Sequence, residues 1–378
     1  MTTETVTATV RESAATATPL RIAGRGTWLD AGRPVSAGRS VSLADDRGVV
    51  SYVPGDLTLT VRAGTPLSEI SSVTAEHNQW LPLDPYGSDD GTIGATMATA
   101  SAGPLASSFG LPRDLLLGVE FVNGRGEVIR AGGRVVKNVA GFDLSRLVTG
   151  SWGTLGVITE VTVRLYAKPQ ADRTFVIELG GSEHEVGTVI RAILTAPLTP
   201  FAFQLASRSI SRALGVGENP VALLRFGGSD AVVNAQVSGL SQLARPREVE
   251  NEVWTSLRAV DAGAHTAVRV SSLPQRFAAS SARILGDDVP GIYTSIDPRR
   301  GVMRILVGSA TGDDGDATPP QEFATDGEGS SSVIFEKLPD DLWGSVSPSV
   351  VADPLSQRIR KAYDPHGILN PGILGEDA

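Results

Sequence analysis

The sequence predicts an α+β protein with two domains. Its 378 residues exceed what one hydrophobic core usually serves, which favours at least two domains. Up to residue 165 the chain reads mainly as short strands separated by glycine-containing turns, whereas after Pro169 strands and helices alternate. We therefore expect a first domain over residues 1–169, a second over 170–345, and a C-terminal segment over 346–378.

The first domain is expected to begin with an amphipathic helix over residues 4–17, because apolar residues from Val6 to Ala17 recur at helical spacing. A second helix is predicted over residues 65–78, with Thr65 as its N-cap. The expected strands of this domain are residues 19–22, 49–53, 57–61, 115–123, 127–131 and 155–165.

The second domain is expected to mix both kinds of element. Its predicted strands are residues 174–179, 201–205 and 221–226, and its predicted helices are residues 185–195 and 231–243. Residues 310–332 are acidic and rich in glycine, proline and serine, which predicts a flexible surface loop. A last helix is predicted over residues 354–363, followed by a loop over residues 364–372.

Composition excludes several classes of function. The chain has no cysteine, so it holds neither a thiolate metal site nor a Cys-ligated iron–sulfur cluster, and any redox cofactor of this chain is expected to be organic. Its four histidines are scattered, and no metal site is expected. The net charge of −9 argues against nucleic-acid binding. No apolar run is long enough to span a membrane and no signal peptide is evident, so we expect a cytoplasmic protein.

The familiar nucleotide and hydrolase motifs fail. Gly24-Arg25-Gly26 could begin the Rossmann motif GxGxxG, but Leu29 replaces its third glycine and no helical pattern follows. The phosphate-binding motif GxxxxGK[ST] and the nucleophile motif GxSxG are absent.

Several glycine loops remain without a motif to explain them. They contain Gly24 and Gly26, Gly91 and Gly94, Gly103, Gly110, and Gly150, Gly153 and Gly156. A single loop of this kind is usually only a turn. Several of them beside strands and hydroxyl side chains are what a diphosphate held by backbone N–H groups would need, and they favour a large, extended ligand.

These loops carry a family resemblance. Residues 4–169 resemble the FAD-binding domain of the vanillyl-alcohol-oxidase (PCMH) type, on residues 23–27, 91–95, 100–103, 108–114 and the sequence Gly-Ser-Trp-Gly-Thr-Leu-Gly-Val-Ile at 150–158. The resemblance implies two FAD-binding subdomains and a smaller α/β, ferredoxin-like cap. The cofactor-binding residues that it implies are Ala23, Gly24, Arg25, Gly26, Thr27, Trp28, Gly91, Thr92, Gly94, Ala95, Ala100, Ser101, Gly103, Ser108, Gly110, Gly153, Gly156, Val157, Ile158 and Asn370.

Two further segments narrow the resemblance. Residues 132–147 are similar to the smaller FAD-binding subunits of glycolate oxidases, and residues 367–372 resemble the Gly-Ile-x-Asn-Pro-Gly ending of flavin-linked 2-hydroxy acid dehydrogenases. This implies a C-terminal segment that returns to the FAD domain, with Lys137 and Asn138 near the cofactor. It also implies, as partners, a larger paralogous FAD subunit, an iron–sulfur subunit and a membrane reached peripherally through them. Thr27 stands where covalently flavinylated relatives carry histidine, so FAD is expected to bind non-covalently.

The catalytic candidates are weaker. Oxidation of a small 2-hydroxy acid needs a base for the hydroxyl proton and a cation for the carboxylate. Arg225 and Arg304 are the candidate cations and His366 is the candidate base, although a solvated or paired arginine and a surface turn histidine are the commoner roles of such residues. The His-Asp-Gly-Asn motif of catalytic relatives is absent. A flavin-linked 2-hydroxy acid oxidase subunit, a flavin-holding subunit without catalysis and a stand-alone FAD-dependent alcohol oxidase therefore all stay open.

Overall fold

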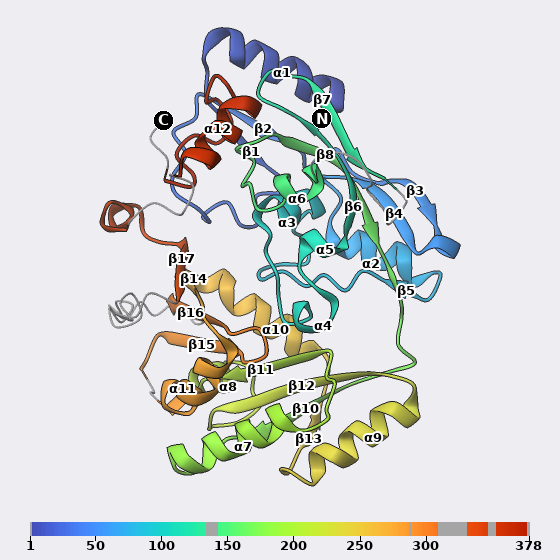
Figure 1. The fold of residues 1–378 in the computed structure, drawn as a ribbon, viewed down its shortest axis with the longest axis vertical. Coiled ribbons are helices and arrows are strands. Elements are labelled where there is room, and N and C mark those ends of the chain that lie inside the picture. Colours follow the sequence, from blue (N-terminus) through green and yellow to red (C-terminus); the bar gives the residue numbers. More distant parts are fainter. Residues whose placement is uncertain (1, 134–142, 287–288, 309–330, 347–352, 376–378) are drawn as a thin grey trace. The chain divides into compact units, whose positions relative to one another are not determined.

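The computed structural model describes residues 2–133, 143–286, 289–308, 331–346 and 353–375. The chain divides into two compact units. Unit 1 comprises Met1–Gly103, Gly110–Lys168 and Asp340–Ala378, and unit 2 comprises Pro104–Phe109 and Pro169–Pro339 (Figure 1). The segment that rejoins unit 1 thus begins at Asp340, a few residues before the predicted position 346. Lys137, Asn138 and almost all of the predicted acidic loop lie outside the described residues.

Unit 1 is organised around a five-stranded antiparallel sheet in the order β3-β4-β8-β6-β7. Its strands are β3 (Val49–Val53), β4 (Thr58–Arg62), β6 (Leu116–Val122), β7 (Val128–Gly132) and β8 (Val157–Arg164). These strands match the sequence prediction to within about two residues because their apolar alternation faces one core. Two smaller sheets pair β1 (Leu20–Ala23) with β2 (Arg39–Ser42), and β5 (Gln79–Trp80) with β9 (Tyr166–Ala167).

Unit 1 contains short helices, and the N-cap of one of them differs from the prediction. They are α1 (Thr3–Thr16), α2 (Leu67–Ala75), α3 (Ile93–Thr99), α5 (Pro112–Leu115), α6 (Leu144–Val148) and α12 (Pro354–Tyr363). The predicted cap of α2 is wrong, because the N-cap is Pro66. The Thr65 hydroxyl instead donates to the Arg62 carbonyl at 2.7 Å and accepts from the Gly48 amide at 2.9 Å, so it closes the turn after β4.

Unit 2 has an eight-stranded antiparallel sheet in the order β13-β10-β12-β11-β15-β16-β14-β17. Its strands are β10 (Ala171–Glu178), β11 (Ala202–Ala206), β12 (Val221–Gly228), β13 (Arg247–Val249), β14 (Ala264–Ser271), β15 (Ile292–Asp297), β16 (Val302–Gly308) and β17 (Ser332–Lys337). The first four strands have the order fourth-first-third-second, and the last four have the same order reversed. Two ferredoxin-like halves therefore join edge to edge through β11 and β15, a repeat that the sequence did not reveal.

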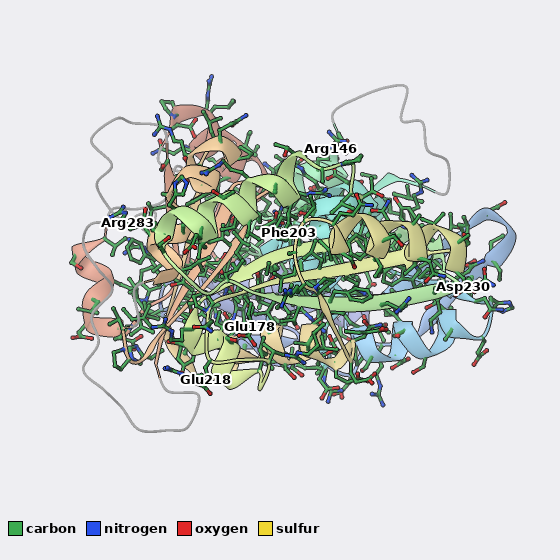
Figure 2. The ribbon with its side chains drawn as sticks, turned by 90° about the horizontal axis from the view of Figure 1, so that it is seen from below. Arg146, Glu178, Phe203, Glu218, Asp230 and Arg283 are labelled. Atoms are coloured by element: carbon green, nitrogen blue, oxygen red, sulfur yellow. The ribbon has the colours of Figure 1, made fainter. Side chains whose placement is uncertain are left out.

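Helices cover both faces of this sheet. One apolar cluster joins the sheet to α7 (Glu183–Thr195), α9 (Asp230–Ser241) and α11 (Pro274–Gly286), and a second joins it to α8 (Arg208–Ala213) and α10 (Glu252–Ala259). Figure 2 shows Phe203 inside this layered core, whereas Glu218, Asp230 and Arg283 lie at the exposed surface. The short helix α4 (Ala106–Phe109) also belongs to unit 2, since Ser107 donates to the buried carboxylate of Asp297 at 2.6 Å.

Candidate functional site

The glycine loops of unit 1 surround one cleft, with about 1040 Å³ of space free of protein atoms counted out to its solvent-open mouth. Five segments line it, within residues 21–31, 85–88, 91–101, 152–158 and 370–373, together with the single residues Leu43 and Ala63. The sequence-predicted residues that line it are Ala23, Gly24, Arg25, Gly26, Thr27, Trp28, Gly91, Thr92, Gly94, Ala95, Ser101, Gly153, Gly156, Ile158 and Asn370.

The 24–27 loop at the end of β1 leaves a row of backbone donors free. Among the described residues, no hydrogen bond takes up the N–H groups of residues 24–27. Gly26 has a φ of 76° and open space where a side chain would begin, while a Cβ at Gly24 would lie 2.3 Å from the Thr92 hydroxyl oxygen. Successive free N–H groups on such a turn form an anion-binding concavity, so the loop fits a diphosphate.

The charges around the cleft suit the same group. Among the residues that the structure describes, the charged ones that line it are Arg21 and Arg25, and none is acidic. Arg21 donates from Nη2 to the Leu29 carbonyl at 3.0 Å, whereas its buried Nη1 has no hydrogen-bond partner among the described residues. Burial lowers the pKa of the Arg21 guanidinium, which nevertheless keeps its proton at neutral pH. A chain of net charge −9 therefore presents a positive cleft, as a bound anion requires.

The loop at residues 150–153 is held by the end of α3. The last carbonyls of a helix have no partner within the helix. Those of Met97 and Ala98 accept from the amides of Gly150 at 3.0 Å and Trp152 at 2.8 Å. Trp152 thereby stacks on Trp28, with ring centroids 5.9 Å apart and planes inclined by 29°, and both residues line the cleft.

Asn370 brings the C-terminal segment to the same cleft. Its side-chain oxygen accepts from the amide of Ile22 at 2.8 Å, and its Nδ2 donates to the carbonyl of Trp152 at 2.7 Å. Its backbone amide donates to Leu20, and Leu20 donates in turn to Ile368. One side chain therefore ties β1 to the 150–153 loop.

Five of the predicted cofactor residues do not line the cleft. Ala100 ends α3 in the left-handed conformation, and Val157 is fully buried in the core of unit 1. Gly103 and Gly110 allow close packing on Asp84 and Asp114, respectively. Ser108 belongs to unit 2, where its hydroxyl donates to the carbonyl of Pro200 at 2.9 Å. Their glycine or small-residue character serves chain packing, which sequence alone did not separate from ligand contact.

Other lining residues were missed by the sequence reasoning. Arg21 and Ile373 are examples, as is the segment at residues 85–88. The alternation of side chains along a strand offered one signal for Arg21, because neighbouring residues point to opposite faces. Leu20 is fully buried in the core, so Arg21 points away from it. Nothing comparable marked Ile373.

The three catalytic candidates are engaged elsewhere or exposed. Arg225 on β12 forms a two-point ion pair with Asp172, with contacts of 2.8 and 2.6 Å. His366 is exposed in the loop after α12. Arg304 on β16 is buried and forms ion pairs with Asp261 and Glu336. The structure thus places Arg225 and Arg304 in unit 2 and His366 in unit 1.

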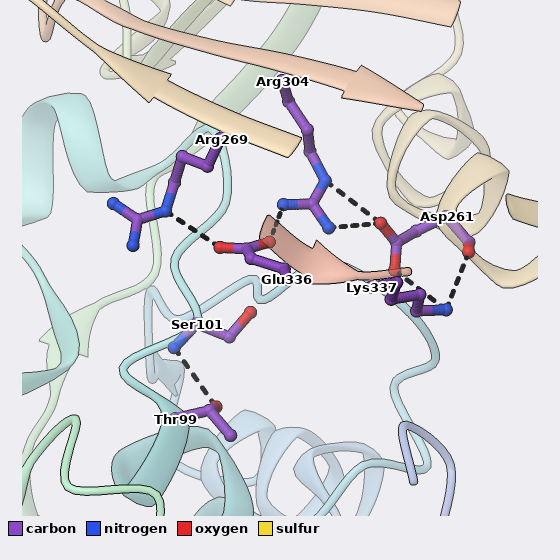
Figure 3. A network of polar contacts seen from close by, with 7 residues as sticks. All are labelled: Thr99, Ser101, Asp261, Arg269, Arg304, Glu336 and Lys337. Atoms are coloured by element: carbon purple, nitrogen blue, oxygen red, sulfur yellow. Dashed lines mark hydrogen bonds and ion pairs between the residues drawn. The ribbon is translucent and has the colours of Figure 1, made fainter. Parts of the chain in front are cut away.

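The partners of Arg304 extend into a larger buried network, drawn in Figure 3. Arg269 donates to Glu336 at 2.9 Å, and the Lys337 ammonium lies 3.7 Å from the Asp261 carboxylate. Asp261, Glu336, Arg304 and Lys337 are each less than 10% exposed. Charges so deeply buried need each other, because an uncompensated one is costly. Arg304 therefore stabilises unit 2 through its two carboxylate partners.

Comparison with known proteins finds a family match for the N-terminal part of the chain, which supplies most of the cleft lining. Residues 1–132 match the family model described as FAD binding domain. The chain is 41% identical over 164 residues to glycolate oxidase subunit GlcE of Escherichia coli, covering 43% of this chain and 46% of that protein. It is 34% identical over 157 residues to glycolate oxidase subunit GlcD of Bacillus subtilis, covering 41% and 33%. These matches span less than half of either relative.

The fold has solved counterparts. The 4-ethylphenol oxidase from Gulosibacter chungangensis superposes with a TM-score of 0.73 at 18% identity, covering 99% of this chain and 88% of that one. This likeness, and the equal TM-score of a p-cresol methylhydroxylase structure, confirm the predicted fold class, an α+β fold of the PCMH type. FAD is the cofactor that this domain binds, as the sequence predicted. Within the described ranges, no helix is long and apolar enough to cross a membrane.

Proposed function

We propose that this chain, whose residues 1–132 belong to the FAD binding domain family, is the FAD-binding subunit of a glycolate oxidase-type complex that oxidises 2-hydroxy acids. The observation that carries cofactor binding is the cleft of unit 1. Within the described part of the chain, its N–H groups at residues 24–27 are free, and two arginines but no acidic side chain line it. The assignment to glycolate and its relatives rests on the 41% identity to GlcE over the matched region.

The cleft residues divide the work of holding FAD. The 24–27 loop would donate hydrogen bonds to the diphosphate, with Arg21 and Arg25 supplying positive charge. Gly91, Gly94 and Ala95 would let the extended cofactor lie close to the backbone. Thr27 offers no ring nitrogen for a covalent bond, which favours non-covalent binding. Bound FAD would supply the acceptor for the hydride that leaves the hydroxyl-bearing carbon.

The three candidate catalytic residues give little support for substrate oxidation by this chain itself. Arg225 and Arg304 already pair with carboxylates, and His366 stands exposed. This observation favours the second candidate function, a flavin-holding subunit that leaves substrate oxidation to a partner. We propose the same partners that the sequence resemblance implies, a larger FAD subunit and an iron–sulfur subunit, in a cytoplasmic complex that touches membranes through them. The zero cysteine count of this chain requires that an iron–sulfur relay with thiolate ligands be on another chain.

One experiment separates these functions. The purified chain is reconstituted with FAD, made anaerobic, and mixed with glycolate or D-lactate while the flavin absorbance is recorded. Bleaching supports a catalytic subunit, and rapid return of colour when O₂ is admitted points to a stand-alone oxidase. A flavin spectrum that hydroxy acid leaves unchanged, but that bleaches once the partner subunits are added, identifies the flavin-holding subunit. Absence of any bound flavin contradicts the proposal.

A further inference from the structure

Trp152 has a backbone conformation that its residue type disfavours. Its φ is 54°, in the left-handed region that bulky side chains rarely adopt. The other non-glycine residues with positive φ among those described have simple reasons. Ala17, Leu57 and Ala100 end helices, and Asn78 and Asn370 are of the type that tolerates this region best. Trp152 follows no helix end directly, so its strain needs another explanation.

The surrounding chain fixes this conformation from two sides. The Trp152 amide donates to the carbonyl of Ala98 at the end of α3, and its carbonyl accepts from Asn370 Nδ2. Gly150 and Gly153, with φ of 79° and 76°, permit the reversals on either side. A tryptophan that served core packing alone would be buried, whereas Trp152 is only partly buried and lines the cleft.

The indole ring of Trp152 is backed by other parts of unit 1. A Cβ at Gly32 would lie 3.0 Å from its Cζ3 atom and 2.8 Å from Ile373, so the chain packs tightly against the ring. Trp28, which directly follows the 24–27 loop, stacks beside it at 5.9 Å and also lines the cleft. The two indoles thus form an aromatic wall of the cleft, and one of them, Trp28, is the next residue in the chain after the proposed diphosphate loop.

We propose that Trp28 and Trp152 form a stacking platform for the adenine ring of the bound nucleotide. This inference rests on FAD binding in the cleft. Large aromatic side chains bind planar heterocycles through their faces, and such stacking is independent of hydrogen-bond pattern. Adenine is favoured over the flavin ring because its ribose is a shorter link to the diphosphate than the ribityl chain, and the platform adjoins the 24–27 loop. Trp152 is held in a strained conformation because that conformation presents its ring to the cleft.

The test uses apo-protein and three probes, ADP, FMN and FAD. A variant with Trp80, Trp254 and Trp343 replaced by Phe leaves the two cleft tryptophans as the source of indole fluorescence. ADP is expected to quench this fluorescence at saturation, with FMN giving weaker quenching. W152G is expected to weaken ADP binding about tenfold, which corresponds to the lower part of the stacking range, and W152F by less.

Controls separate this inference from folding and from the proposed function. A100G relieves a left-handed conformation outside the cleft lining and should leave ADP affinity unchanged. If W152G fails to fold by circular dichroism, W28L and W152F carry the comparison. Unchanged ADP affinity in the folded Trp28 and Trp152 variants overturns the platform, as does quenching by FMN without quenching by ADP. Failure of the unaltered chain to bind FAD by flavin absorbance instead contradicts the proposed function.

Discussion

Glu120 on β6 and Glu160 on β8 lie directly opposite each other in the sheet of unit 1. Their outer neighbours are cationic, since Arg62 on β4 pairs with Glu160 and Arg130 on β7 pairs with Glu120. The two carboxylates nevertheless have opposite environments. Burial raises the pKa of Glu160. Burial also acts to raise the pKa of Glu120, but hydrogen bonds from Thr159, Thr3 and Arg130 outweigh it and leave that pKa below its ordinary value.

We therefore expect isosteric substitutions of the two residues to have opposite effects on stability. E160Q should stabilise the chain at pH 7 by about 0.5 kcal/mol, because it removes a charge that burial disfavours and that directly opposes Glu120, effects that Arg62 offsets only in part. A raised folded pKa makes the ionised form unfavourable, so this gain should disappear as the pH falls toward 4. Denaturant unfolding at both pH values measures it. A gain that persists at pH 4 would contradict the electrostatic cause.

E120Q should instead destabilise the chain at pH 7 by about 1–3 kcal/mol, because a buried acceptor of several hydrogen bonds loses its charge. Because the pKa of Glu120 is lowered in the folded chain, its ionisation stabilises the fold at pH values above the ordinary carboxyl pKa. This stabilisation is lost as the pH falls through the folded pKa. The difference from the unaltered chain should therefore narrow in acid. The same unfolding series provides the measurement, with E160Q as the matched control on the neighbouring strand.

Gly24 should tolerate no side chain. In G24A the new Cβ would meet the Thr92 hydroxyl oxygen at 2.3 Å, so the 24–27 loop must move away from residues 91–95. We expect FAD affinity to fall by about tenfold or more, as the cost of overpacking implies. Titration of apo-protein with FAD measures this. G55A is the control, because nothing lies within 4 Å of a Cβ there, and equal affinities of the two variants would refute the tight contact.

Arg21 should contribute charge to cofactor binding. R21Q is expected to weaken FAD binding by about tenfold at low salt, in the range of hydrogen bonds to charged groups. It should also reduce the salt dependence of that binding. R47Q removes an equal charge from an exposed position outside the cleft lining and should change little. An unchanged salt dependence in R21Q would show that the guanidinium does not act on the bound anion.

Arg304 should prove structural. R304M leaves Asp261 and Glu336 buried without their main cation, so we expect unit 2 to lose about 3–5 kcal/mol of stability. FAD binding in the cleft of unit 1 should persist where the variant stays folded. Thermal unfolding and FAD titration test the two halves of this expectation. Normal stability with loss of hydroxy acid oxidation would restore Arg304 as a substrate-binding residue.

Asn370 should act through both ends of its amide. N370D keeps an acceptor for the Ile22 amide but loses the donor to the Trp152 carbonyl, whereas N370A loses both. We expect FAD to dissociate faster in N370D, because the 150–153 loop loses its contact with residue 370. Dissociation should be faster still in N370A, because β1 loses its contact as well. Stopped-flow exchange against excess apo-flavoprotein measures the two rates. Equal rates in the two variants would argue against a role for the Trp152 contact.

Much of this protein could be anticipated from local sequence. Helices such as α1 and strands such as β8 follow from apolar periodicity, which depends only on neighbours along the chain. Asp143 caps α6 with its side chain, the role for which aspartate is locally preferred. The glycine loops pointed to a backbone-lined site for a large ligand, and most of their residues do line one cleft. Thr65 shows the limit, because a distant amide of Gly48 took the hydroxyl that a local rule assigned to α2.

The sequence by itself determined the α+β class, the region that binds FAD and the chemical character of its loops, because these depend on residue type and short spacing. Only the tertiary structure decided which glycines face the cleft, which arginines are paired, and that Asn370 joins Ile22 to Trp152. The partners in those contacts lie tens to hundreds of residues apart in the chain. Such pairings arise when the whole core is packed, so local patterns carry no record of them.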